Sequence, residues 1–369
     1  MERWKPWHSV LADATDSVLF VQGFIGEAER GILTVAADGL VTNYVLHPVS
    51  GHPSLDRMFH LTLGDLGPIS SITSDCVDGP PSMLYSGHTK GHVSRWSVRG
   101  RLLTQLSGHQ AAVTVTRYLG SGPDLATASM DGTIRAWHLA ASECVLVLEL
   151  GLRNPVADLV LLSPLELVVA TWDGQLRFLS WQLEAAQACC NKALQATMVQ
   201  VRAICAWRPD DSEFEVFAGT DEGEISCWSS GGVAQRLSWQ GHWSQICSLS
   251  ICKAWLISLA EDKLVRLWDA KTGKLLADYW GHGGGVLCSS VLWPMLWTGS
   301  RDHTVRSWDL EEVEVQLREL ASMRICDAES LHYEVNFSRL TAKQLKKLAA
   351  AAKAAAKGKA EKRKGNARR

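Results

Sequence analysis

Short stretches of alternating apolar and polar residues recur along the chain and predict β-strands. Segments 263–269 (KLVRLWD) and 303–309 (HTVRSWD) alternate in this way, which is the period-2 pattern of a strand with one buried face. Each follows a short apolar run, 254–260 (AWLISLA) or 294–300 (PMLWTGS), that ends at a polar turn as a buried strand does. The pattern therefore predicts pairs of adjacent strands joined by tight turns.

The segment around these strands occurs three times. Each copy begins with Gly-His and carries a Ser or Thr, an Asp and a Trp at matched positions, and the last two copies lie 40 residues apart. The three sets are His109, Thr127, Asp131 and Trp137; His242, Ser258, Asp262 and Trp268; and His282, Thr298, Asp302 and Trp308. A period of about 40 residues is the mark of a repeat architecture.

Four weaker copies fill the rest of the repeat region, at 31–44, 82–96, 166–181 and 214–228. Their strand patterns are intact, but their incoming loops lack a matched Gly-His pair, which puts their internal hydrogen bonds in doubt. Gly-His also occurs at 51–52, before a loop, and at 87–88, inside a strand pattern. We therefore expect neither His52 nor His88 to fill the histidine position of a repeat.

Gly-His at one end of a 40-residue unit and Trp-Asp at the other resembles the WD-repeat family. The resemblance implies an all-β fold, a seven-bladed β-propeller, in which the His, Ser or Thr, Asp and Trp of one repeat form a hydrogen-bonded tetrad. Stacking in a ring lets each small sheet bury both faces. The sequence leaves open whether the N-terminal segment, with Trp4 and Trp7, or the strand-like segment 313–317 (VEVQL) seals the ring.

Charge divides the chain into an acidic part and a basic tail. Residues 341–369 hold eleven Lys or Arg and one acid, Glu361, a net charge of +10; since the whole chain has 37 basic and 39 acidic residues, residues 1–340 have 26 and 38, a net charge of −12. We expect a propeller at 1–320, a connecting segment at 321–340 and a basic tail at 341–369, helical from Thr341 to Lys357 or disordered. The tail residues singled out for partner contacts are Leu345, Leu348, Lys346, Lys347, Lys362, Arg363 and Lys364.

Catalysis, cofactor binding and metal binding find no support in the sequence. A repeated set of Ser or Thr, His and Asp evokes a hydrolase triad, but an enzyme needs one site rather than three, and these hydroxyl residues fall in mid-strand. No GxxxxGK[ST], GxGxxG, HExxH or zinc-finger spacing occurs, so we expect no catalytic residue, no cofactor, no metal and no small-molecule substrate.

The resemblance implies that the turns before the third strand and the Gly-His loops open onto one face of the disc, where ligands of WD-repeat proteins usually dock. Trp172 and Trp243 are the leading candidates for partner anchors, since exposed aromatic side chains are typical of interfaces. Arg301 is the best single candidate for an acidic or phosphorylated ligand. The remaining candidates for this face are Lys90, Met130, Glu261, Lys263 and His303, with Thr89, Gln110 and Gly283 beside them.

Two classes of function fit these features. The first is a non-enzymatic scaffold, a subunit or adaptor that binds other proteins in a larger assembly. The second is an RNA-associated or ribosome-assembly factor whose tail contacts RNA. The lack of a signal peptide or a long apolar run, and ten cysteines without a CxxC pair, predict a protein that is neither secreted nor in a membrane, with a cytoplasmic, nuclear or nucleolar location.

Overall fold

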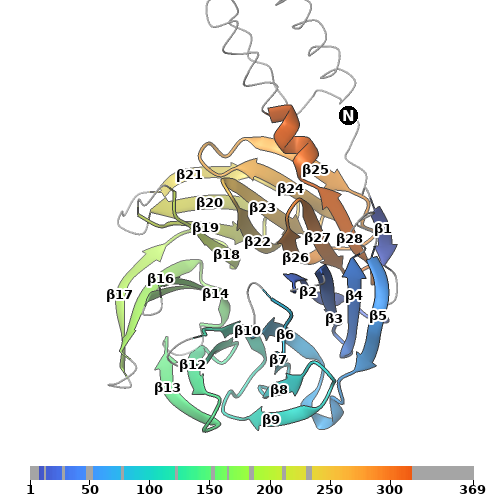
Figure 1. Cartoon of the computed structure of the whole chain (residues 1–369). Helices are drawn as coiled ribbons and strands as arrows, with labels where there is room; N and C mark the ends of the chain where they lie inside the picture. Colours follow the sequence, from blue (N-terminus) through green and yellow to red (C-terminus); the bar gives the residue numbers. More distant parts are fainter. Residues whose placement is uncertain are drawn as a thin grey trace, which may run out of the picture.

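The computed structural model of the chain describes residues 8–11, 14–26, 30–46, 53–75, 79–120, 124–150, 154–163, 166–182, 187–209, 213–229 and 235–317. These residues form seven antiparallel four-stranded sheets arranged as blades around a centre (Figure 1). The chain is therefore the seven-bladed β-propeller that the repeats predict. The expected connecting segment at 321–340 and tail at 341–369 lie outside the described residues.

Each blade is built outward from an inner strand. The inner strands are β2 (Val18–Ile25), β6 (Ile69–Ser74), β10 (Val113–Tyr118), β14 (Val156–Ser163), β18 (Val201–Trp207), β22 (Ile246–Cys252) and β26 (Val286–Leu292). The second strands are β3 (Arg30–Ala36), β7 (Met83–His88), β11 (Leu125–Ser129), β15 (Glu166–Thr171), β19 (Glu215–Thr220), β23 (Trp255–Ala260) and β27 (Met295–Ser300).

The outer half of each blade completes the sheet. The third strands are β4 (Leu40–Leu46), β8 (Val93–Ser97), β12 (Thr133–His138), β16 (Gln175–Gln182), β20 (Glu224–Ser229), β24 (Leu264–Asp269) and β28 (Val305–Asp309). The outermost strands are β5 (Pro53–His60), β9 (Leu102–Leu106), β13 (Glu143–Glu149), β17 (Gln187–Gln195), β21 (Gln235–Gln240), β25 (Leu275–Trp280) and, for the last blade, β1 (His8–Leu11). Blades are numbered 1 to 7 from β2 to β26 by their inner strands.

The hydrophobic core lies between neighbouring blades. Each inner strand contacts the inner strand of the next blade, and β26 contacts β2, so the seven form a closed cycle. One cluster of buried residues, for example, joins Val115 and Ala126 of blade 3 to Leu159 and Leu167 of blade 4. Since each blade buries both faces against neighbours, nearly every residue of the second strands is buried, and most of these residues are apolar or small.

The N-terminal strand closes the ring. β1 pairs antiparallel with β28, with His8 opposite Ser307 and Leu11 opposite Val305, so one blade combines both ends of the described chain (Figure 1). The alternative of a sealing strand at 313–317 is wrong, because residues 311–317 are helical. The Asp309 carboxylate accepts the Glu311 N–H at 2.8 Å as a helix cap, and Val313 packs into the core between blades 6 and 7.

The remaining elements are short. A 3-10 turn (Gly64–Leu66) precedes β6. No helix among these described segments is both long and apolar enough to cross a membrane.

Candidate functional site

Three blades contain the hydrogen-bonded chain expected from the repeats. In blade 6 the Nδ1 atom of His242 lies 2.9 Å from Oδ2 of Asp262, and its Nε2 lies 2.6 Å from Oγ of Ser258. The Nε1–H of Trp268 donates to the same Ser258 Oγ at 2.8 Å. Because a carboxylate only accepts, Nδ1 carries the proton, Nε2 accepts from the hydroxyl, and the hydroxyl accepts from the indole.

Blades 3 and 7 repeat this geometry closely. The distances are 3.1, 2.8 and 2.8 Å for His109–Asp131, His109–Thr127 and Trp137–Thr127. They are 3.0, 2.9 and 2.8 Å for His282–Asp302, His282–Thr298 and Trp308–Thr298. The structure therefore brings together all three predicted sets of four residues.

Burial determines the charge state of these tetrads. Burial lowers the pKa of His242, and this outweighs the opposing effect of the Asp262 carboxylate. Burial acts to raise the pKa of Asp262, but hydrogen bonds from His242 and from the backbone N–H groups of Trp243 and Leu264 hold it below its ordinary value. The histidine is therefore neutral and the aspartate ionised near neutral pH. The hydroxyl of Ser258 is completely buried, so no substrate can reach it.

Blade 2 forms a variant of the tetrad, which the sequence analysis did not predict. Trp96 Nε1–H donates to Ser86 Oγ at 2.7 Å, and Ser86 lies 2.9 Å from Nε2 of His88. As expected, His88 does not occupy the histidine position of the repeats, which lies in the loop before the inner strand, but from β7 its side chain reaches the equivalent hydroxyl. Ser86 and His88 both belong to β7, two residues apart, and side chains two residues apart in a strand point to the same face. With Lys90 at the usual position of the turn aspartate, His88 uses Nδ1 to reach the Gly67 carbonyl at 3.1 Å.

The turns after the second strands and the loops that enter the inner strands lie at the same end of the central channel. In every blade the first turn residue donates its backbone N–H, over 2.9–3.1 Å, to the carbonyl of the residue just before the inner strand. The seven donors are Ala37, Thr89, Met130, Trp172, Asp221, Glu261 and Arg301. We call this end of the disc the loop face.

The predicted face residues differ in how far they are accessible. Trp243 is 82% exposed and Met130 is 38% exposed. Trp172 is half-buried, with the guanidinium of Arg202 lying 5.0 Å from its ring centre, so its ring is less available to a partner. Glu261 is half-buried. The other predicted residues of this face are exposed: Lys90, Lys263, Arg301, His303, Thr89, Gln110 and Gly283.

Two of the predicted cations on the loop face are engaged by other groups of the chain. Nε of Arg301 lies 2.9 Å from Oε1 of Glu261, and this pair links the turns of blades 6 and 7. Gly285 makes room for it, because a Cβ there would lie 2.1 Å from Oε2 of Glu261. Lys90 donates to the Asp65 carbonyl at 2.9 Å. Arg301 thus already has a carboxylate partner, which lowers its value as a free anion-binding group.

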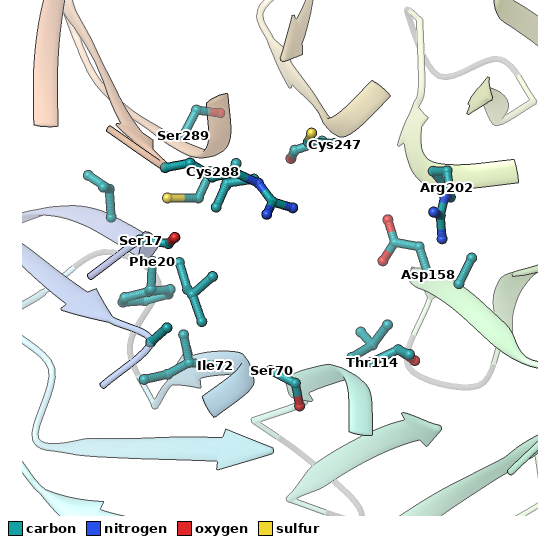
Figure 2. A pocket seen from close by; sticks show the side chains of 18 of the residues that line it. Ser17, Phe20, Ser70, Ile72, Thr114, Asp158, Arg202, Cys247, Cys288 and Ser289 are labelled. Atoms are coloured by element: carbon teal, nitrogen blue, oxygen red, sulfur yellow. The ribbon is translucent and has the colours of Figure 1, made fainter. Parts of the chain in front are cut away.

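The centre of the ring contains an open cavity of about 580 Å³ lined by the inner strands and by the turn residues Ala37, Glu261 and Arg301 (Figure 2). Arg117 of blade 3 lies 3.3 Å from Asp158 of blade 4, and Asp158 also accepts the backbone N–H of Ile204 in blade 5 at 2.9 Å. Burial raises the pKa of Asp158, which outweighs the effect of Arg117. Arg202 of blade 5 donates to Gln245 of blade 6 at 3.0 Å. These polar groups tie neighbouring blades together across the channel.

Sequence reasoning missed these channel residues, although a signal was present. Asp158 and Arg202 each interrupt a mostly apolar inner strand, as in VRAICAW at 201–207, and Arg117 is the charged residue of β10. It also missed Met198, in the loop between β17 and β18, which is 94% exposed. Nothing in the composition of that loop distinguishes a surface methionine from a packed one. Within the part of the chain that the structure describes, no group of three or more His, Cys, Asp or Glu side chains could hold a metal ion.

A known protein-family model matches two of the segments that contain tetrads. The family model described as "WD domain, G-beta repeat" matches residues 100–138 and 234–269, which contain the complete tetrads of blades 3 and 6. Zinc finger CCCH domain-containing protein 17 of Oryza sativa subsp. japonica is 28% identical over 195 residues, covering 50% of this chain and 40% of that protein.

Other relatives have different names. Nuclear distribution protein nudF of Emericella nidulans is 27% identical over 218 residues, covering 56% of this chain and 41% of that protein. Ribosome biogenesis protein WDR12 homolog of Oryza sativa subsp. japonica is 26% identical over 235 residues, covering 60% of this chain and 48% of that protein. The chain thus spans less than half the length of each of these three curated relatives, and their names agree on no single activity.

Proposed function

Because the chain belongs to the WD-repeat β-propeller family, we propose that it is a non-enzymatic scaffold, a subunit or adaptor that holds other proteins in a larger assembly. WD-repeat proteins generally act as protein-interaction scaffolds. The buried tetrads support a structural role for the recurring Ser or Thr, His and Asp, since Thr127, Ser258 and Thr298 have no exposed surface.

The observation that carries this proposal is the exposure of Trp243 on the loop face. Its indole is 82% exposed, whereas its backbone N–H is held by Asp262 Oδ2 at 3.2 Å. Exposure of a large apolar ring to water is unfavourable in free energy, and burial in a partner's pocket would remove this cost. The loop on which it lies is rigid because it belongs to a tetrad, so little conformational freedom is lost on binding.

The test is purification of the full chain from its own cells with its partners attached. Trp243→Ala should release a partner that the wild type retains, without changing the melting temperature, because the substitution preserves the backbone N–H that reaches Asp262. Met58→Ala is the matched control, since Met58 is 52% exposed on the outer strand β5, away from the loop face. Retention of every partner by Trp243→Ala, or equal losses from both variants, would refute docking through this residue.

A second candidate function is an RNA-associated role for the tail, in the cytoplasm or the nucleus. Its support is the charge separation between residues 1–340 and residues 341–369, together with similarity to a protein named as a ribosome biogenesis protein. An acidic disc repels phosphates, so RNA contact would be confined to the tail and leave the loop face to protein partners.

A further inference from the structure

The two most exposed large hydrophobic side chains that the structure describes lie on either side of one turn. Met198 is 94% exposed in the loop between β17 and β18, and Trp243 is 82% exposed in the loop between β21 and β22. These two loops enter and leave blade 5. Between them lies the turn of that blade, residues 221–223, which follows β19.

Backbone contacts fix both loops against this turn. The N–H of Asp221 donates to the carbonyl of Gln200 at 3.1 Å, at the end of the Met198 loop. On the other side, the N–H groups of Gly241 and His242 both donate to the carbonyl of Gly223 at 2.9 Å. A Cβ on Gly223 would lie only 2.2 Å from the His242 carbonyl oxygen, so the Trp243 loop passes directly against the turn.

Blade 5 has lost the tetrad that engages the turn carboxylate in other blades. The backbone N–H groups of Ala196 and Thr197 donate to the Gly174 carbonyl, which matches the bonds from Gly241 and His242 to the Gly223 carbonyl. Thr197 therefore occupies the position that corresponds to His242. Ala218 lies ten residues before Trp228, at the position where the blades with a tetrad have Ser or Thr. Trp228 instead donates to Ser226 at 3.0 Å.

Two carboxylates of this turn have no cationic partner within the described ranges. Glu222 occupies the tetrad aspartate position and is exposed, and the buried Oδ1 atom of Asp221 has no hydrogen-bond donor among the described residues. The ion pairs within the described segments involve neither carboxylate. The turn carboxylates of the other blades do find partners: Asp131, Asp262 and Asp302 bind histidines, and Glu261 binds Arg301.

Arg202, the inner-strand cation of the same blade, is directed elsewhere. Its guanidinium stacks 5.0 Å from the ring centre of Trp172, and Nη2 donates to Gln245. The turn of blade 5 therefore presents negative charge flanked by two apolar side chains. Because Glu222 is exposed, a cation from another molecule can reach its carboxylate.

We propose that Met198, Asp221, Glu222 and Trp243, here the blade-5 surface, bind a basic segment of a partner protein. Lys and Arg match this surface in both of its properties. Their apolar stems pack on the methionine and the indole, while the cationic ends lie over the ring face of Trp243 and against the two carboxylates. The net charge of −12 on residues 1–340 attracts such a segment. This inference rests on the proposed docking role of the loop face and specifies the chemistry of its partner.

The direct test uses two fluorescent peptides, one of alternating Lys and Leu and one with Glu in place of every Lys, titrated with the full chain. The Lys peptide should bind, and the Glu peptide should not. The double variant Asp221→Asn/Glu222→Gln, which removes charge but preserves shape, should weaken binding about tenfold. Glu143→Gln/Glu149→Gln is the matched control, because it removes two exposed charges from the outer strand β13 and should leave affinity unchanged.

Equal affinity for both peptides, no binding of the Lys peptide to the wild type, or equal weakening by the two double variants would overturn the proposal. Purification with native partners separates its failure from that of the docking role. If Trp243→Ala loses a partner that Asp221→Asn/Glu222→Gln retains, the loop face docks a partner that is not basic. If both variants retain every partner, docking through this face is itself refuted.

Discussion

The backbone N–H of Trp243 donates to Oδ2 of Asp262 over 3.2 Å, and the same carboxylate holds Nδ1 of His242 at 2.9 Å. One half-buried aspartate thus fixes the interior of blade 6 and the loop that presents its most exposed large hydrophobic side chain. The stability of the blade and the placement of the docking residue are thereby coupled through Asp262.

Removal of this carboxylate should lower the stability of the fold. Asp262→Ala leaves the His242 Nδ1–H and the N–H groups of Trp243 and Leu264 without their acceptor, and we expect a loss of about 1–3 kcal/mol in the free energy of unfolding. The neighbouring Lys263→Ala should change it by less than about 0.5 kcal/mol, because Lys263 is exposed and Ala adopts its positive φ of 72° with a similar penalty. A urea titration in which the two variants lose equal stability would contradict this role of Asp262.

The variant tetrad of blade 2 gives a prediction with a closely matched control. Ser86→Ala removes the acceptor of Trp96 Nε1–H and the partner of His88, so it should cost about 1–3 kcal/mol. Ser94→Ala, in the adjacent strand β8, should be neutral or stabilising. Ser94 is equally buried, but its Oγ has no hydrogen-bond partner among the described residues.

Both serine variants are compared by denaturant titration under one set of conditions. The two substitutions are identical in chemistry and lie in one blade, so their difference isolates the hydrogen bonds. A Ser94→Ala loss as large as that of Ser86→Ala would show that the chain Trp96–Ser86–His88 contributes nothing specific.

The repeats predicted the blade count and the tetrads because both depend on spacing alone. His242, Ser258, Asp262 and Trp268 keep positions that follow from strand periodicity, and periodicity is visible in a sequence. His88 could not be found this way. It reaches Ser86 from the same strand, which depends on side-chain direction and on the location of the Gly67 carbonyl.

The blade-5 surface was only half visible for a similar reason. Trp243 was identified because it follows a Gly-His pair, but Met198 lies in a loop without a recognisable motif. That the loops of Met198 and Trp243 enclose the Asp221–Glu222 turn is a consequence of ring packing between blades. Likewise, segment 313–317 alternates like a strand, yet its position after Asp309, which caps a helix, decides its structure.

Acid should weaken the fold through the buried histidines before it reaches the carboxylates. Burial lowers the pKa of His88, His109, His242 and His282 in the folded protein. Below the ordinary histidine pKa of 6.5 the unfolded chain therefore binds protons that the folded chain does not, so stability falls as pH falls. The turn aspartates add to the loss below 3.8, because their folded pKa values are depressed.

This dependence is measured as the free energy of unfolding between pH 7.5 and pH 5, within about 0.3 kcal/mol per point. His282→Gln should reduce the slope, since it removes one buried group that resists protonation. His303→Gln is the control, because its side chain is exposed on the loop face and should leave the slope unchanged. Stability that is constant over this range would contradict neutral buried histidines.

Deletion of residues 341–369 separates the two candidate functions. If the tail is an RNA arm, its eleven cations neutralise phosphates, and each one adds about −0.7 to the slope of log affinity against log salt for single strands. The segment contains no aromatic residue on which a base could stack, so no base preference should appear. The deletion is then expected to abolish binding to an unstructured RNA while partner docking at Trp243 continues.

Leu345→Ala/Leu348→Ala is the matched control, because it removes the apolar side chains of the tail but keeps every charge. Loss of a protein partner from this control, with little dependence on salt, would identify the tail as a protein-docking segment. If the full chain shows no measurable RNA binding, the RNA-associated role is refuted, and the scaffold role remains as the proposed function.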